Sequence, residues 1–313
     1  MENTNKGNKT YDLIVIGSGP AGLSASIYAS RYKLNHIVIG EETGGQAVNA
    51  WSVENYPGFE KIAGKDLMEK FKAQAEKLGA EITSNSANKI EKKGEGYAVN
   101  TTSGETYEAK SIILALGMKP RKLNLPNEDK FIGKGVSYCA TCDAAFFKNK
   151  DVAVIGGGDA AGTAAIHVSE FAKKVYIIYM EGGLIMEPTW KEQIEKNPKI
   201  ELVSCTKITE VTGENTVKGL KYEDKDGAKE LSVQGVFVEI GSVPGVMLAK
   251  ELGIETDEQG YIKVNAEQGT NVENIYAAGD VTTGSNKFRQ IITASAEGAV
   301  AAGSVYKKLK LSK

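Results

Sequence analysis

Cysteine is scarce in this sequence: three cysteines occur among 313 residues. Secreted scaffolds that depend on disulfides usually carry a larger, even set of cysteines. A chain of this length has room for about two ordinary domains and can bury a hydrophobic core without covalent staples. The scarcity therefore excludes a disulfide-rich scaffold and favours a reducing compartment, where a close pair of cysteines serves redox chemistry or metal binding.

Histidine is scarcer still, with His36 and His167 as the only two. A structural zinc site needs four ligands, and neither histidine nor Cys205 stands at zinc spacing from Cys139 and Cys142. We therefore expect no metal site. We interpret Cys205 as a small buried hydrophobic residue and both histidines as structural.

A strong charge of one sign and long apolar runs are also missing. The 38 Lys and Arg nearly balance the 40 Asp and Glu, and the net charge of -2 gives no reason to expect a nucleic acid or an anionic membrane as partner. No apolar run approaches the roughly 20 residues that span a bilayer. The polar start, residues 1–10, lacks the apolar stretch of a signal peptide. We expect a soluble, cytoplasmic protein.

A glycine-rich turn near the start is the first positive signal. A short apolar run at 11–16 leads into Gly-Ser-Gly-Pro-Ala-Gly at 17–22, then a helical pattern to about residue 32 and a second apolar run at 36–39. In such a turn the glycines permit the tight bend, the approach of a pyrophosphate and close helix packing, while the helix N-terminus offers unpaired N–H groups. The residues predicted to bind this dinucleotide, including two acids for its ribose, are Gly17, Ser18, Gly19, Pro20, Ala21, Gly22, Glu41 and Glu42.

The same pattern returns in the middle of the chain. A strand at 151–155 precedes Gly-Gly-Gly-Asp-Ala-Ala at 156–161, a helical stretch at 164–171 and another strand at 175–178. Two such beginnings in one chain indicate two Rossmann-like units. The remaining patterns predict a buried strand at 111–115, a hairpin of 216–222 with 229–233 around Asp226-Gly227, a break at 241–245, a strand from 275 running into a loop at 280, and a C-terminal helix over 290–309.

The run Cys139-Ala140-Thr141-Cys142-Asp143 carries the chemistry. Residues 144–147 could start a helical turn, and a thiol at a helix N-terminus has a lowered pKa because the dipole stabilises the thiolate. Two cysteines at this spacing close a small ring, which opens by attack of an external thiolate or a reduced cofactor. Asp143 could exchange protons during that reaction. The alternative is a pair of inert, buried thiols.

Together these runs resemble the low-molecular-weight thioredoxin reductases, a class of FAD-dependent pyridine nucleotide-disulfide oxidoreductases. The resemblance covers nearly the whole chain. The segments 44–46 and 53–59 are similar to family segments that embrace FAD, and Ala-Ala-Gly-Asp-Val at 277–281 with Arg-Gln at 289–290 is similar to the family's second FAD motif. The residues that the resemblance adds to the FAD site are Gly45, Gln46, Asn55, Gly279, Asp280, Arg289 and Gln290.

The resemblance implies an α/β fold of two Rossmann-like, three-layer ββα nucleotide-binding domains, the second inserted in the first. Residues 1–118 and 244–313 would form the FAD-binding domain, and residues 119–243 an inserted NAD(P)H-binding-like domain that carries the cysteines. The family works by rotation of one domain against the other, and the runs at 117–120 and 241–245 are the expected hinges. A homodimer is expected as well.

The resemblance also assigns roles at the disulfide. Cys142 would be the thiol nearest the flavin, Cys139 would attack the disulfide of thioredoxin or a thioredoxin-like protein, and Asp143 would be the acid/base. The candidate nicotinamide-nucleotide residues of the inserted domain are Gly156, Gly158, Asp159, Ala160, Ala161 and Glu181.

The sequence departs from the family at this second nucleotide site. NADPH-using members have a His-Arg-Arg run and a further Arg that clamp the 2′-phosphate, whereas residues 179–185 read Tyr-Met-Glu-Gly-Gly-Leu-Ile. Glu181 would repel the phosphate. In the helix after the glycine turn, Thr163 and Ala164 replace the Glu-Glu of the family. We therefore predict a donor other than NADPH: NADH, with Glu181 on its 2′-hydroxyl, or ferredoxin or a reduced deazaflavin, with the glycine turn left as a structural remnant.

The predicted function is thioredoxin-disulfide reductase, in which electrons pass from the donor to FAD, to the disulfide and to thioredoxin. A flavin-dependent small-molecule dithiol oxidase of the same fold is an alternative, and so is a non-catalytic flavin redox sensor. A large apolar pocket beside Cys139 would favour the oxidase, and a lack of turnover with any donor would favour the sensor.

Overall fold

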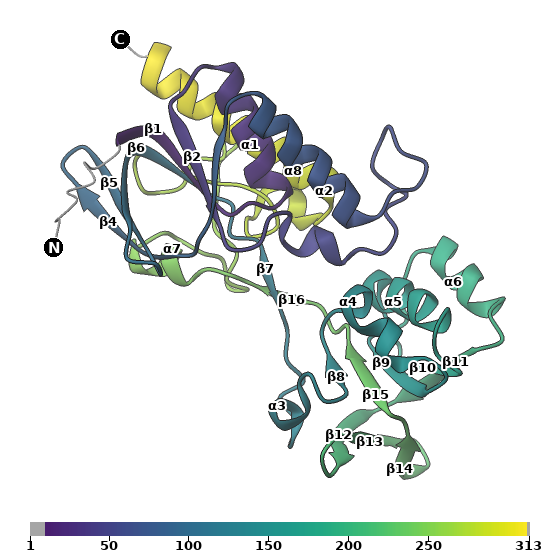
Figure 1. The fold of residues 1–313 in the computed structure, drawn as a ribbon. Coiled ribbons are helices and arrows are strands. Elements are labelled where there is room, and N and C mark those ends of the chain that lie inside the picture. The colour runs from purple at the N-terminus through teal and green to yellow at the C-terminus, as the bar shows by residue number, and fades with distance from the viewer. Residues whose placement is uncertain (1–9, 312–313) are drawn as a thin grey trace, which may run out of the picture. The chain divides into compact units, whose positions relative to one another are not determined.

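The computed structural model describes residues 10–311, which divide into two units (Figure 1). The first comprises residues 10–48, 53–119 and 244–311, and the second comprises Asn49–Ser52 and Pro120–Val243. The divisions after 119 and 243 lie within one residue of the expected domain limits. The segment Asn49–Ser52 was expected in the first unit but packs with the second.

The first unit is built on a seven-stranded sheet in the order β3-β2-β1-β6-β5-β4, with β17 also paired to β6. The pairs among β1, β2, β3, β6 and β17 are parallel, whereas β4, β5 and β6 pair antiparallel. Its strands are β1 (Thr10–Ile16), β2 (His36–Gly40), β3 (Glu81–Ser84), β4 (Ala87–Lys93), β5 (Gly96–Thr101), β6 (Thr106–Leu114) and β17 (Ile275–Ala277). Its α-helices are α1 (Pro20–Arg31), α2 (Gly64–Lys77), α7 (Met247–Glu251) and α8 (Ile291–Tyr306), and its shorter turns are η1 (Gly45–Asn49), η3 (Gly284–Lys287) and η4 (Lys307–Leu311).

The core of this unit lies on both faces of β1. Six consecutive residues of β1 are buried, which fits the apolar run that the sequence shows there. Strands covered on both faces need such continuous runs, because neither side meets water. Helices α1 and α8 pack together over one face, so two segments far apart in the sequence share this layer (Figure 1).

The second unit has a five-stranded parallel sheet in the order β11-β10-β9-β15-β8 and a separate three-stranded antiparallel sheet, β12-β13-β14. The strands are β8 (Val136–Ser137), β9 (Asp151–Ile155), β10 (Lys174–Met180), β11 (Ile200–Cys205), β12 (Lys207–Gly213), β13 (Val217–Asp224), β14 (Gly227–Ser232) and β15 (Gly235–Val238). The helices are α3 (Glu128–Phe131), α4 (Ala140–Asp143), η2 (Ala144–Phe147), α5 (Asp159–Ser169) and α6 (Pro188–Glu195). The predicted α/β class with Rossmann-like units is confirmed.

Two short strands connect the units. β7 (Met118–Pro120) and β16 (Ser242–Pro244) pair in a two-stranded sheet, and the divisions after residues 119 and 243 fall inside them. These strands coincide with the two expected hinge segments. The assignment of the units to FAD and to a nicotinamide nucleotide stays a prediction.

Several element limits differ from the sequence-based expectations. Helix α5 ends at Ser169, before the predicted limit of 171, and the C-terminal α-helix ends at Tyr306 and continues as a π-helical turn to Leu311. The predicted hairpin is present, but its turn residues are Lys225 and Asp226, because Gly227 already pairs with Asp224. Gly227 has φ +113, a conformation that favours glycine at the end of such a turn.

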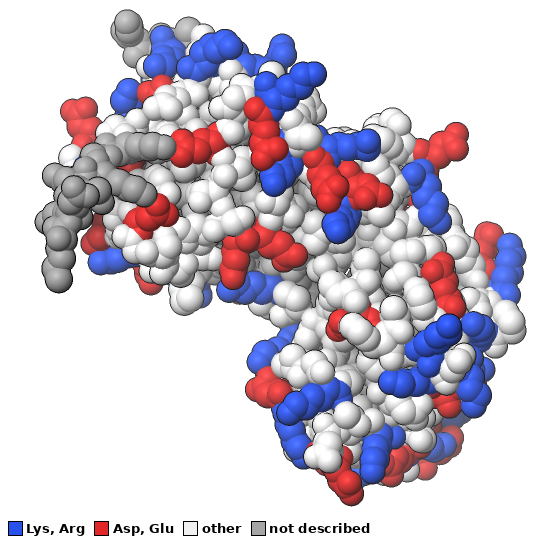
Figure 2. Space-filling model, in the orientation of Figure 1, with Lys and Arg blue, Asp and Glu red and all other residues white. Residues whose placement is uncertain are grey.

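Charges are mixed over the surface, as the net charge of -2 suggests. Figure 2 shows basic and acidic side chains interspersed on the visible face of each unit. Within residues 10–311, every helix is too short or too polar to cross a membrane. Cys205 is fully buried, and burial raises the pKa of its thiol, as expected for a hydrophobic packing residue.

Candidate redox and nucleotide-binding sites

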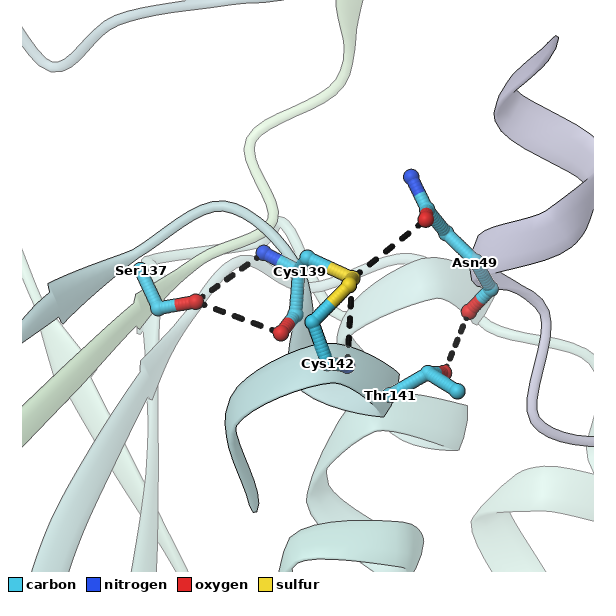
Figure 3. Close-up of a disulfide and its surroundings, with 5 residues drawn as sticks. All are labelled: Asn49, Ser137, Cys139, Thr141 and Cys142. Carbon is cyan, nitrogen blue, oxygen red and sulfur yellow. Dashed lines mark hydrogen bonds between the residues drawn. A yellow bond between two sulfur atoms is a disulfide. The ribbon is translucent and has the colours of Figure 1, made fainter. Parts of the chain in front are cut away.

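The cysteine pair closes a disulfide at the head of a helical turn. Cys139 and Cys142 are joined by their sulfurs, and Cys139 is the N-cap residue of α4 (Figure 3). The backbone N–H of Cys142 donates to the sulfur of Cys139 at 3.2 Å. The helical turn expected at 144–147 is present as η2, but another turn, α4, precedes it from Ala140, because the Cys139 sulfur serves as the acceptor that a capping residue supplies.

The strand before the disulfide fixes its position. β8 ends at Ser137, whose hydroxyl accepts from the backbone N–H of Cys139 at 3.0 Å and donates to the Cys139 carbonyl at 3.2 Å. Cys139 is half-buried and Cys142 is exposed. Asp143 ends the turn, half-buried, and its backbone N–H donates to the Cys139 carbonyl at 3.2 Å. The disulfide is thus held rigidly on the Cys139 side and open on the Cys142 side.

Asn49 also contacts the disulfide, and it was not predicted as a site residue. Its Oδ1 lies 3.3 Å from the Cys139 sulfur, and its carbonyl accepts from the Thr141 hydroxyl at 2.6 Å (Figure 3). Two residues later, Trp51 stacks on His167 of α5 with ring centroids 5.3 Å apart. A polar residue between two segments typical of FAD binding was the only available signal.

The first glycine turn has the properties of an anion site. Gly17 has φ +110, and a Cβ there would lie 2.0 Å from the carbonyl oxygen of Ala115, so only glycine fits. Helix α1 begins at Pro20 after Gly19, without a side-chain cap and without an acidic residue in its first turn. Its first N–H groups are therefore left for a ligand, and the dipole favours a negative charge there.

The predicted ribose acids follow β2 at the same edge of the sheet. Glu41 and Glu42 are both exposed. The Glu41 carboxylate accepts from the Ser86 hydroxyl at 2.8 Å, and the Glu42 carbonyl accepts from the Ser18 hydroxyl at 3.0 Å. Glu42 is therefore tied to the glycine turn by its backbone, while the Glu41 side chain is oriented by Ser86.

The other predicted FAD residues converge from distant parts of the first unit. The backbone N–H of Gly44 donates to the Ser18 carbonyl at 2.7 Å, which brings the 44–46 segment against the glycine turn. The Gln46 amide donates to the Met118 carbonyl at 2.7 Å. The Asn55 amide donates to Gln290 Oε1 at 3.1 Å, although 235 positions separate the two residues.

The second FAD motif is organised by Glu297, another residue that the sequence did not single out. This carboxylate is 5% exposed and accepts from the backbone N–H of Gly279 at 2.8 Å and from the Thr282 hydroxyl at 2.9 Å. Burial raises the pKa of the neighbouring Asp280 to about 6; Arg289 acts in the opposite direction, and Glu297 adds to the increase. Arg289 itself donates to the Tyr261 hydroxyl at 3.0 Å.

These features of the first unit fit FAD. An uncapped helix N-terminus and a glycine turn suit a pyrophosphate, exposed acids at the end of β2 suit a ribose, and the Gly279–Asp280 loop lies close to that helix, since a Cβ on Gly279 would approach the Ala21 side chain to 2.8 Å. The residues that would hold the cofactor are those predicted from the sequence, supported by Glu297.

The second glycine turn differs because a loop lies directly on it. A Cβ on Gly157 would lie 1.9 Å from the carbonyl oxygen of Gly183, and the backbone N–H of Ile185 donates to the Gly157 carbonyl at 2.8 Å. The Asp159 carboxylate accepts from the backbone N–H of Glu187 at 2.6 Å. The loop at 181–187 is therefore fastened to both the turn and the helix that follows it.

Apolar side chains stand at the positions where the phosphate clamp of NADPH-using members was expected. Met180 is 51% exposed and Ile185 is 78% exposed, and Glu181 between them is exposed as well. The Thr163 hydroxyl donates to the Asp159 carbonyl at 2.9 Å within its own helix, so it is engaged locally. Among residues 179–185 none is basic.

A half-buried acid, Glu239, lies at this edge of the sheet and was not predicted. It follows β15, which pairs with β9 on one side and β8 on the other, so it stands between the strand that leads to the glycine turn and the strand that leads to the disulfide. Burial raises the pKa of Glu239 to about 8. The carboxyl is therefore largely protonated at neutral pH.

Comparison with known proteins gives a consistent result. Residues 11–298 match the family model described as pyridine nucleotide-disulphide oxidoreductase. A thioredoxin reductase of Streptomyces coelicolor is 41% identical over 297 residues, which cover 93% of this chain and 91% of that protein.

Two solved structures are informative. The thioredoxin reductase of Lactococcus lactis in its FR conformation superimposes with a TM-score of 0.90 at 36% identity, covering 95% of this chain and 98% of that one. A ferredoxin–flavin thioredoxin reductase from Clostridium acetobutylicum has a TM-score of 0.52, also at 36% identity, covering 96% of this chain and 99% of that one.

Proposed function

The chain belongs to the pyridine nucleotide-disulphide oxidoreductase family, a family of flavoprotein enzymes, and we propose that it is a thioredoxin-disulfide reductase whose donor is not NADPH. The observation that carries the proposal is the disulfide of Cys139 and Cys142 at the head of a helical turn, with Cys139 half-buried and hydrogen-bonded and Cys142 exposed. The similarity to thioredoxin reductases over nearly the whole chain supports thioredoxin, or a thioredoxin-like protein, as the partner.

FAD would be held by the first unit. Its isoalloxazine ring, when bound, supplies a two-electron carrier that can reduce a disulfide. The chain's own residues do the binding: the α1 N-terminus holds the pyrophosphate, Glu41 or Glu42 the ribose, and Asp280 the ribityl-phosphate region, with Arg289 and Gln290 near the ring.

Cys139 and Cys142 have different roles because their surroundings differ. Cys142 is exposed and is the sulfur that accepts electrons from the flavin side. Cys139 then attacks the partner's disulfide, and Asp143, one residue beyond Cys142, exchanges the proton. Phe146, 73% exposed four positions after Cys142, offers an apolar contact for a protein partner.

The second nucleotide site supports a donor other than NADPH. An NADPH site needs cationic groups for the 2′-phosphate, and the exposed Met180, Glu181 and Ile185 supply none. NADH remains compatible, with Glu181 accepting from a ribose hydroxyl. A ferredoxin is the other candidate, favoured by the similarity to a ferredoxin–flavin thioredoxin reductase.

The family-based architecture completes the proposal. Residues 1–118 and 244–313 act as the FAD-binding domain and residues 119–243 as the inserted domain, with β7 and β16 as hinges for a rotation between reduction of the disulfide and delivery to the partner. The protein would act as a homodimer.

The experiment that tests this proposal is anaerobic mixing of the purified yellow protein with NADPH, NADH and reduced ferredoxin in turn. We expect NADPH to bleach the flavin poorly and one of the other two to bleach it fully. Rapid bleaching by micromolar NADPH would overturn the donor assignment.

A second experiment tests the disulfide roles. Cys142→Ser should still bind FAD but lose electron transfer to thioredoxin, since the exposed sulfur is the entry point. Full thioredoxin reduction by that variant would contradict the assignment, and absence of thioredoxin reduction by the parent protein with every donor would favour the flavin sensor.

A further inference from the structure

The two sulfurs of the disulfide have unequal surroundings. The Cys139 sulfur lies 3.2 Å from the backbone nitrogen of Cys142 and 3.3 Å from Oδ1 of Asn49 (Figure 3). The Cys142 sulfur belongs to an exposed residue. Polar groups are therefore gathered around the sulfur that becomes the thiolate when the exposed sulfur is attacked.

The contact with Asn49 changes its character when the disulfide opens. A disulfide sulfur carries no proton, so Oδ1 of Asn49 meets it as a polar contact and not as a hydrogen-bond acceptor. A thiolate, in contrast, accepts hydrogen bonds, and a half-turn of the Asn49 carboxamide presents one of its N–H donors to the sulfur. Hydrogen bonds to an ionised acceptor are about twice as strong as neutral ones, so the exchange favours the charged form.

Asn49 is fastened in place from both sides. Its carbonyl accepts from the Thr141 hydroxyl at 2.6 Å, inside the same helical turn as the disulfide. Two residues further on, the Trp51 ring stacks on His167, which in turn meets Phe171 edge-on at 5.5 Å. The segment is thereby attached to α4 and to the end of α5, which explains why Asn49–Ser52 groups with the second unit.

We propose that Asn49 is a catalytic residue that stabilises the thiolate of Cys139 when the disulfide is reduced. The proposal deepens the proposed function, because it names the group that makes Cys139 the leaving sulfur in the first step and the attacking sulfur in the second. Together with the Cys142 N–H, the Asn49 amide gives this thiolate two donors.

The chemical step balances with an external dithiol as reductant. A thiolate of the dithiol attacks the Cys142 sulfur, the S–S bond breaks, and its electron pair passes to the Cys139 sulfur. The second dithiol sulfur then displaces Cys142, and the dithiol leaves as a cyclic disulfide. Of the two protons of the dithiol, one ends on Cys142 and one in solvent, while Cys139 remains as the thiolate.

Few charged groups surround this sulfur in the described structure. Asp143 lies on the same turn, and His167 lies behind Trp51 with its pKa lowered by burial and with Glu170 near its ring. The turn η1, which ends at Asn49, contains no charged residue. Asp143 opposes a thiolate, so the neutral donors have to supply the stabilisation.

The test measures the Cys139 thiol without any donor or partner protein. In a Cys142→Ser background, the ultraviolet absorbance of the thiolate and the rate of alkylation by iodoacetamide are followed against pH. Cys205 is buried and contributes little to alkylation in the folded protein. We compare Asn49→Asp, which has the same shape but only acceptors, with Asn49→Leu, and use Asn215→Leu on the exposed β12–β13 turn as the control.

We expect Asn49→Asp to raise the pKa of Cys139 by about one pH unit or more, Asn49→Leu to raise it less, and the control to leave it unchanged. Reduction of the intact disulfide by dithiothreitol should slow about tenfold at neutral pH in Asn49→Asp. Thermal melts identify any variant that fails to fold, in which case Asn49→Leu and Thr141→Val carry the test. Identical titration of Cys139 in all folded variants would overturn the proposal.

This outcome is separable from that of the proposed function. If NADPH proves to be the donor, or thioredoxin is not reduced, the titration of Cys139 still reports on Asn49 alone. If Cys139 titrates unchanged, the donor experiments stand.

Discussion

The two glycine turns of this chain have nearly the same sequence pattern and different surroundings. At the first turn, α1 starts without a cap or an acid, and the exposed acids Glu41 and Glu42 follow the next strand. At the second turn, the loop at 181–187 is bonded to the turn, and exposed apolar side chains stand at the clamp positions. A glycine pattern thus specifies the backbone conformation of the turn, whereas the residues after the next strand, β2 or β10, determine which ligand the turn can bind.

The largest expected effect comes from filling the space at the turns themselves. Gly17→Ala forces a Cβ to within 2.0 Å of the Ala115 carbonyl at φ +110 and should abolish bound FAD and lower the melting temperature sharply. In Gly157→Ala the added Cβ would lie 1.9 Å from the carbonyl oxygen of Gly183, so the loop would have to shift. This variant should be less stable but should still bind FAD. Flavin absorbance after gel filtration measures both variants.

The matched control for this pair is Gly79→Ala, which has φ +91 but open space around its Cβ position. It reports the backbone strain alone, about 1 kcal/mol. Retention of FAD by Gly17→Ala would mean that the first turn tolerates a side chain. The proposed difference between the two turns in FAD binding would then be wrong.

A second prediction concerns arginines placed where the phosphate clamp of NADPH-using members was expected. The triple variant Met180→Arg, Glu181→Arg and Ile185→Arg places guanidinium groups at the matching positions of NADPH-using members. Charge-assisted bonds to phosphate stabilise by about 1.5–3 kcal/mol each, so the rate of flavin bleaching at low NADPH should rise about tenfold or more. Stopped-flow absorbance with NADPH and NADH measures the change in preference.

Glu181→Gln is the control, since it removes the negative charge without adding a donor for phosphate. It should change the NADPH rate only slightly. Equal NADPH rates in the parent and the triple variant would show that the loop, folded onto the turn, excludes the nucleotide whatever its charge.

The smallest expected effect concerns two half-buried acids beside the two turns, Asp280 in the first unit and Glu239 in the second. Burial raises the pKa of Asp280 to about 6, and it raises the pKa of Glu239 from its ordinary value of 4.5 to about 8. Between about pH 4.5 and pH 8 the folded state keeps a proton on Glu239 that the unfolded state has lost. Stability from this group is therefore complete below the unfolded pKa and is lost as the pH rises through the folded pKa.

Glu239→Gln should remove this dependence, which amounts to about 1.4 kcal/mol per pH unit at most. Urea unfolding at several pH values between these limits measures the slope, and Glu187→Gln, on the loop, serves as the control. An unchanged slope in Glu239→Gln would show that the carboxyl is already ionised in the folded protein.

Much of the site could be predicted from the sequence because local patterns mark it. The turn at 17–22, the Cys-x-x-Cys run and the motif at 277–281 each combine a short strand with residues of special backbone or chemical character, and such patterns act within a few residues. Element limits were less accurate, as at α4, where a sulfur replaces the usual oxygen of a capping residue.

Asn49, Glu239 and Glu297 were not predicted, and they share a physical reason. Each lies beside a neighbour that is distant in sequence: Cys139 for Asn49, the adjacent strands β8 and β9 for Glu239, and the Gly279 amide for Glu297. The local sequence around an asparagine or a glutamate does not indicate such a distant partner. Its role depends on burial and on distance, which no local pattern encodes.

The sequence by itself determined the two Rossmann-like units and the cysteine pair that forms the disulfide, because glycine turns, apolar strands and closely spaced cysteines are local requirements. The tertiary structure decided which sulfur is surrounded by polar groups, that the loop at 181–187 lies on the second turn, and that Glu297 is buried. These properties depend on segments far apart in the chain, since electrostatic and packing effects follow distance in space and not position in the sequence.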